Sequence, residues 1–203
     1  MSELKQAGLP LEKAKKAAIL IHGRGASAES ILTLESHLNL EGYAILAPQA
    51  SGNSWYPFSF MASDSQNKVA LENSLIAIKE VWDKILDAKI SPENIVLIGF
   101  SQGACLSLEF ASRNAQKLGG IIAFTGGLIG ENVQPEKYSG NFTGTKVFIG
   151  SSERDFHVPL ARIKASAEFM EKMGANVKQL IFSDSDHTIR KEEIDWVNKN
   201  ILL

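Results

Sequence analysis

The sequence predicts an α/β fold, with helices on both faces of an open, doubly wound and mostly parallel sheet. Three observations lead to this prediction. Short apolar runs recur along the 203 residues, amphipathic helical patterns separate them, and one run ends in a glycine-bounded turn that opens a helix. Because the length suits one domain, we expect residues 1–203 to form a single unit with a sizeable core.

The expected strands are continuous in apolar residues rather than alternating with polar ones. This pattern is typical of strands that are buried on both faces of a parallel sheet. The expected strands cover residues 17–22, 43–47, 95–100, 120–125, 146–151 and 177–182.

Helical periodicity fills the stretches between these strands. Asp64 or Ser63 can cap the longest helix. Two aperiodic segments remain: residues 126–141 are rich in glycine and predict a surface loop, and residues 51–63 are rich in aromatic side chains. The expected helices cover residues 27–40, 64–88, 104–112, 160–173 and 190–202.

The composition excludes several functional classes. Hydrophobic residues make up 44% and charged residues 22%, and a net charge of −2 argues against nucleic acid as a partner. A single cysteine, Cys105, allows no intrachain disulfide and favours a reducing compartment. Residues 1–10 lack the apolar core of a signal peptide, and no stretch approaches the length of a membrane span. We therefore expect a cytoplasmic protein without integral membrane association.

The glycine-bounded turn carries the strongest functional signal. Gly99-Phe100-Ser101-Gln102-Gly103 follows an apolar run and precedes a helical pattern, which is the setting of a Gly-x-Ser-x-Gly nucleophile elbow. Small residues on either side let strand and helix approach closely, so that the Ser101 hydroxyl stands exposed near a helix N-terminus. Ser101 is therefore the candidate nucleophile.

A serine hydroxyl needs a base, and that base needs an orienting acid, in the chain order Ser, Asp/Glu, His. Asp155 follows the expected strand 146–151, and His187 follows the expected strand 177–182, so both are predicted at the same sheet edge as Ser101. The competing histidines lie in a helical pattern, at a strand end or next to the acid. The competing acids lie close in sequence to Asp155 or to His187. These alternatives are His37, His22 and His157 for the base, and Glu153, Asp184 and Asp186 for the acid.

An acyl-transfer reaction also needs preorganised donors for its oxyanion. The backbone N–H of Gln102 is one candidate, because it follows the nucleophile. The glycine-rich stretch His22-Gly23-Arg24-Gly25 follows the first expected strand, which makes the backbone N–H of Arg24 the second candidate. The sequence leaves open whether the Arg24 side chain points to solvent or lines the mouth of the site.

These motifs together resemble the phospholipase/carboxylesterase family of small α/β-hydrolases, which includes bacterial carboxylesterases and acyl-protein thioesterases. The matching pieces span nearly the whole chain: Ile21-His-Gly-Arg-Gly25, Gly99-Phe-Ser-Gln-Gly103, Asp155-x-x-Val-Pro159 and Asp186-His187. The resemblance implies an α/β-hydrolase fold with a minimal cap or none, a Ser101–Asp155–His187 triad, an oxyanion hole from Arg24 and Gln102, and no metal or cofactor. Arg24 is a departure, since family members often carry an apolar residue there.

The expected activity is that of a serine hydrolase that cleaves carboxylic esters and, as further options, thioesters or lysophospholipids. Its expected partner is a small-molecule ester or thioester, and a homodimer stays open. A non-catalytic ligand-binding module on the same scaffold is the alternative. Aromatic residues near the site are candidate walls of the substrate pocket: Trp55, Tyr56, Phe58, Phe60 and Phe156.

Overall fold

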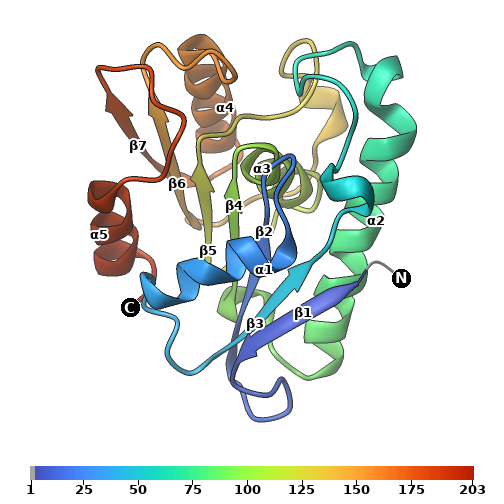
Figure 1. Ribbon diagram of the computed structural model, residues 1–203, viewed down its shortest axis with the longest axis vertical. Helices are drawn as coiled ribbons and strands as arrows, with labels where there is room; N and C mark the ends of the chain where they lie inside the picture. The colour runs from blue at the N-terminus through green and yellow to red at the C-terminus, as the bar shows by residue number, and fades with distance from the viewer. Residues whose placement is uncertain (1–2) are drawn as a thin grey trace.

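A computed structural model describes residues 3–203 and shows a seven-stranded sheet in the order β1-β3-β2-β4-β5-β6-β7 (Figure 1). The edge strand β1 runs antiparallel to β3, and every other pairing is parallel. Because β2 pairs with both β3 and β4, the strand order reverses there, and such a switch point is where open α/β sheets bind ligands. The strands are β1 (Leu4–Gly8), β2 (Lys16–Ile21), β3 (Tyr43–Pro48), β4 (Ile95–Phe100), β5 (Gly120–Phe124), β6 (Lys146–Ser152) and β7 (Asn176–Phe182).

Helices cover both faces of this sheet and divide the core into two parts (Figure 1). α1 and α5 pack on one face, and α2, α3 and α4 pack on the other. Within residues 3–203, no helix combines the length and the apolar character that crossing a membrane requires. The helices are α1 (Ala28–Leu32), α2 (Asp64–Asp87), α3 (Gln102–Arg113), α4 (Leu160–Lys172) and α5 (Lys191–Asn200).

The doubly wound, mostly parallel fold predicted from the sequence is confirmed, and all six expected strands are present within one or two residues of their predicted ends. The strand β1 was not predicted from the sequence; it is short and lies at the sheet edge. The helix expected over residues 27–40 is also too long. It ends at Leu32 and continues as the 3-10 helix η1 (Thr33–Ser36), where the Thr33 and Ser36 hydroxyls donate to carbonyls three residues back.

The surface loop expected over residues 126–141 is buried in its first part, residues 126–130. Side chains on α4 form hydrogen bonds with the backbone groups of this segment, and these bonds permit it to be buried. Arg162 on α4 donates to the carbonyls of Leu128 and Gly130 at 3.0 and 2.6 Å. The Leu128 N–H donates to the Ser166 hydroxyl at 2.9 Å.

The turn between β4 and α3 is the closest backbone approach around the switch point. Ser101 has φ 54° and ψ −116°, a strained conformation for a residue with a side chain. A Cβ atom on Gly103 would lie 2.0 Å from the Ile21 carbonyl oxygen, so only glycine fits there. The first turn of α3 therefore packs directly against the C-terminal end of β2. The chain continues from that end of β2 into the loop with Gly23 and Arg24.

We predict that Gly103→Ala lowers the free energy of unfolding by on the order of 3 kcal/mol, because the new methyl group must displace backbone on β2. Urea denaturation measures this loss. Gly42→Ala is the control: Gly42 has φ +82° but no heavy atom near its Cβ position, so only about 1 kcal/mol of conformational strain is expected. Equal losses in the two variants would contradict the steric explanation.

Candidate active site

Three side chains from three strand ends form one hydrogen-bonded chain. The Ser101 Oγ atom lies 2.8 Å from Nε2 of His187, and Nδ1 of His187 lies 2.7 Å from Oδ2 of Asp155. Ser101 follows β4, Asp155 follows β6 and His187 follows β7, so the parallel strands deliver all three to one edge of the sheet. A neutral imidazole with its proton on Nδ1 can donate to Asp155 and accept from Ser101.

Asp155 is held in one orientation by its own loop. Its Oδ1 atom accepts the backbone N–H groups of His157 and Val158 at 2.7 and 3.0 Å, while Oδ2 faces His187. Its side chain is fully buried. The carboxylate is therefore hydrogen-bonded on both oxygens and cannot turn away from the imidazole.

The alternative acids lie elsewhere. Asp184 pairs with Arg190 at 2.6 Å, and Asp186 lies 3.9 Å from the same guanidinium. Glu153 is exposed. Among the described residues, the carboxylate that bonds to the His187 imidazole is therefore that of Asp155.

The alternative histidines also have other surroundings. His22 is fully buried, with Nδ1 2.7 Å from the Gly23 carbonyl and Nε2 accepting the Ala50 N–H at 3.1 Å. Burial lowers the pKa of His22, which favours the neutral ring that this bonding needs. His37 is exposed, and the His157 ring packs against the edge of His187 at 4.9 Å between centroids. Only His187 reaches both the serine and the acid.

The two candidate oxyanion donors belong to backbone segments beside Ser101. Gln102 begins α3, and Gly23, next to Arg24, would place a Cβ atom 3.5 Å from that of Ser101. Among the described residues, neither the Arg24 N–H nor the Gln102 N–H has a hydrogen-bond acceptor. Two unpartnered backbone donors beside a serine, one of them at a helix N-terminus, suit a developing oxyanion.

A cavity of about 640 Å³ opens in front of Ser101 and His187. Of the aromatic residues predicted to wall it, Tyr56, Phe58, Phe60 and Phe156 do line it. Phe58 is 49% exposed and Phe156 is 89% exposed, so both stand at the rim. The size and the mostly apolar wall are typical of a site for a small organic ligand.

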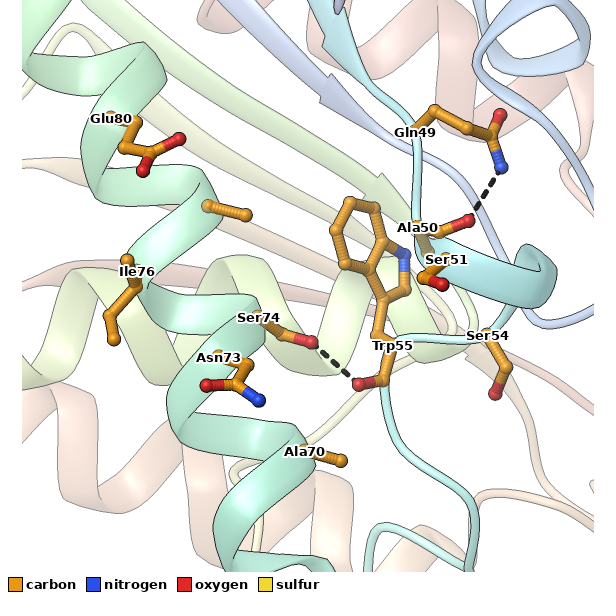
Figure 2. A pocket seen from close by; sticks show the side chains of 11 residues that line it. Gln49, Ala50, Ser51, Ser54, Trp55, Ala70, Asn73, Ser74, Ile76 and Glu80 are labelled. Atoms are coloured by element: carbon orange, nitrogen blue, oxygen red, sulfur yellow. Dashed lines mark hydrogen bonds between the residues drawn. The ribbon is translucent and has the colours of Figure 1, made fainter. Parts of the chain in front are cut away.

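Trp55 differs from the prediction that it walls the pocket, because it is not among the residues that line the cavity. Its indole Nε1 donates to the His22 carbonyl at 2.8 Å, and its ring packs 5.0 Å from that imidazole. Figure 2 shows Trp55 beside α2, where the Ser74 hydroxyl donates to the Trp55 carbonyl at 2.5 Å. Trp55 there borders a second cavity of about 520 Å³, between the loop and α2. Its burial makes it a structural anchor of the loop.

The loop over residues 50–60 is held by the side chains of Gln102 and Arg24, two residues whose predicted role involved only their backbone N–H groups. The Gln102 amide accepts the Trp55 N–H at 2.9 Å and donates to the Tyr56 carbonyl at 2.8 Å. The Arg24 guanidinium donates to the carbonyls of Pro57 and Phe58, each at 2.6 Å. The side chains of Gln102 and Arg24 thus hold the loop that carries the aromatic wall. The backbone N–H groups of the same two residues are the candidate oxyanion donors.

Cys105 lines the cavity, and its surroundings disfavour a nucleophilic role. It is 1% exposed, and burial raises the pKa of its thiol to about 12. A thiol with this pKa stays protonated at neutral pH and is a weak nucleophile.

The segment that carries His187 is anchored to the sheet and to α5. The Ser152 hydroxyl donates to the Asp186 carbonyl at 2.6 Å, and Arg190 donates to Ser152 and to Asp184. The Glu193 carboxylate accepts the Arg190 N–H at 2.7 Å. Glu193 is 1% exposed, and burial raises the pKa of its carboxyl to about 7.

Comparison with known proteins adds an independent finding. The family model described as phospholipase/carboxylesterase matches residues 8–202. The crystal structure of a phospholipase/carboxylesterase from Dyadobacter fermentans is 46% identical with a TM-score of 0.98, covering 100% of this chain and 97% of that one.

Curated relatives are more distant. Acyl-protein thioesterase 1 of Saccharomyces cerevisiae is 28% identical, over 79% of this chain and 70% of its own length. A probable carboxylesterase of Arabidopsis thaliana, described as SOBER1-like, is 22% identical over 91% of this chain and 77% of its own length.

The buried Glu193 predicts a pH-dependent stability. Its carboxyl has a pKa of about 7 in the folded protein and a lower ordinary value in the unfolded chain, so the folded state binds more protons between these values. Stability therefore falls as the pH rises through roughly 4.5 to 7. Glu193→Gln keeps an acceptor for Arg190 and removes the titration. We expect its free energy of unfolding, relative to wild type, to rise by on the order of 2 kcal/mol between pH 5 and pH 8.

Urea titrations at the two pH values measure this difference. Glu168→Gln, at an exposed carboxyl on α4, is the control and should differ from wild type equally at both. A Glu193→Gln variant whose difference from wild type does not change with pH would refute the titration of Glu193.

Proposed function

Since the chain belongs to the phospholipase/carboxylesterase family, we propose that it hydrolyses small-molecule carboxylic esters, and thioesters of similar size, through Ser101, His187 and Asp155. The family and its named relatives establish a serine hydrolase of the esterase and acyl-protein thioesterase class. The observation that carries the proposal is the chain of hydrogen bonds from Asp155 through His187 to Ser101, at 2.7 and 2.8 Å, which ends in an open cavity.

In the first half of the reaction, the Ser101 Oγ atom attacks the substrate carbonyl carbon while Nε2 of His187 takes the hydroxyl proton. The carbonyl oxygen becomes an oxyanion, which accepts hydrogen bonds from the Arg24 and Gln102 backbone N–H groups. The imidazolium that forms is stabilised by the Asp155 carboxylate. His187 then gives its proton to the leaving alcohol or thiol, and an acyl-serine remains.

In the second half, His187 accepts a proton from water, whose oxygen attacks the acyl carbon. The same two backbone groups stabilise the second oxyanion. Its collapse breaks the bond to Ser101 Oγ, which regains the proton from His187, and the carboxylic acid leaves.

We predict that Ser101→Ala lowers kcat/KM for 4-nitrophenyl esters by about 10⁴-fold or more, because no other group can form the acyl-enzyme. The assay uses a series from acetate to laurate with one thioester alongside, so the chain-length optimum also sizes the pocket. Ser36→Ala, at an exposed hydroxyl on η1, is the matched control and should keep full activity. Activity in Ser101→Ala close to wild type would refute the assignment of the nucleophile.

We further predict that Asp155→Asn lowers kcat by about 10⁴-fold with little change in melting temperature. An amide can donate to Nδ1 and so stabilise the wrong imidazole tautomer. Labelling of Ser101 by a fluorophosphonate probe should slow in parallel. If the folded wild-type protein turned over no ester or thioester and failed to react with this probe, the chain would be a ligand-binding module instead.

A further inference from the structure

Arg24 gives the cavity a positive charge. Among the lining residues, all within the described chain, Arg24 alone carries a permanent charge, and none carries a carboxylate. The nearest acid in the site, Asp155, is buried behind His187 and hydrogen-bonded on both oxygens. An anionic group in the cavity would therefore meet a cation and no opposing carboxylate on its wall.

The guanidinium is fixed in place but not neutralised. Nη1 and Nη2 each donate to a backbone carbonyl at 2.6 Å, and the charged carbon lies 6.0 Å from the centroid of the Tyr56 ring. Carbonyls and an aromatic ring carry no net charge, and within residues 3–203 no Asp or Glu forms an ion pair with Arg24. A guanidinium has five N–H groups, so three remain for a ligand.

The position of Arg24 explains why a charge there would act on substrate. The preceding residue, Gly23, lies beside Ser101, and the Arg24 side chain reaches the carbonyls of Pro57 and Phe58, which also line the cavity. The side chain is exposed rather than buried, so it keeps its charge at the rim without a large desolvation cost. Restraint by two hydrogen bonds also reduces the entropy that a long side chain loses when it binds a ligand.

We propose that Arg24 is a specificity-determining residue that selects esters carrying a carboxylate over neutral esters of the same shape. This inference rests on the proposed ester hydrolysis and assigns a substrate class to it. The carboxylate can belong to the acyl part, as in a half-ester of a dicarboxylic acid, or to the leaving alcohol. Both have the same recognition chemistry, a carboxylate at hydrogen-bond distance from a guanidinium.

A purely structural role makes a different prediction. If Arg24 only held the loop, its loss would slow anionic and neutral substrates by the same factor. If it binds substrate, the ratio of the two kcat/KM values changes. The test is therefore this ratio, measured in each enzyme, because damage to the loop cancels within it.

Two pairs of chromogenic substrates separate the acyl and alcohol sides. Mono-4-nitrophenyl adipate and its methyl ester differ in charge on the acyl side, and 4-acetoxybenzoate and 4-acetoxybenzamide differ on the alcohol side. The enzymes are wild type, Arg24→Met and Arg24→Lys. Lys13→Met is the control for net charge, since Lys13 is exposed in the connection before β2, at the opposite end of the strands from Ser101.

We expect the anionic-to-neutral ratio to fall about tenfold from wild type to Arg24→Met in at least one pair. This figure suits a charge-assisted hydrogen bond weakened by solvent exposure. Arg24→Lys should retain part of the ratio, since it keeps the charge but loses the fork. In wild type the ratio should decline in 0.5 M NaCl, and Lys13→Met should match wild type.

The opposite results are equally defined. An unchanged ratio in Arg24→Met for both pairs would overturn the proposal, even if that variant were slower on every substrate. A ratio that fell as far in Lys13→Met would overturn it as well, because the effect would then follow net charge. Failure of the proposed function would look different: wild type would hydrolyse none of the four esters and would not be labelled at Ser101 by a fluorophosphonate.

Discussion

The contact between Gly103 and the end of β2 is the constraint on which the site depends. With no side chain at position 103, the first turn of α3 lies directly on the Ile21 carbonyl. That approach accompanies the strained backbone of Ser101, at φ 54°, directly before Gln102 begins α3. The proposed nucleophile and both proposed oxyanion donors therefore lie around one backbone contact at the switch point between β2 and β4. Strain at Ser101 persists because packing on both sides of the turn fixes it.

A second layer of structure depends on polar side chains around this contact. His22, Arg24 and Gln102 lie in or beside the turn. Their side chains form hydrogen bonds with the backbone of the loop over residues 50–60 and hold it in place. A loop of this length would otherwise leave backbone groups unpaired against the sheet. The residues around the proposed nucleophile thus also hold the aromatic wall of the cavity in place. This arrangement couples the shape of the pocket to the proposed reaction centre.

The parts of this molecule that the sequence could predict are those determined locally. Buried parallel strands have a distinctive apolar run, and the turn at Ser101 needs glycine at Gly99 and Gly103, so the strands and the candidate nucleophile could be predicted. The buried stretch over residues 126–130 could not, because its backbone is satisfied by Arg162 on a distant helix. Trp55 was predicted as a wall of the substrate pocket but packs against His22 and bonds to Ser74 of α2, because the sequence does not indicate which neighbour an aromatic ring contacts.

Arg24 shows how one residue can combine a constant task with a variable one. Every residue except proline supplies the backbone N–H that the proposed oxyanion hole needs, so the reaction places almost no restriction on the side chain at this position. The side chain meanwhile lines the cavity and donates to the carbonyls of Pro57 and Phe58. Substitution here can therefore change which ester fits while the hydrolytic machinery stays intact. A chain that belongs to a family defined by its reaction can in this way carry a substrate preference of its own, and the charge at position 24 is where we locate it.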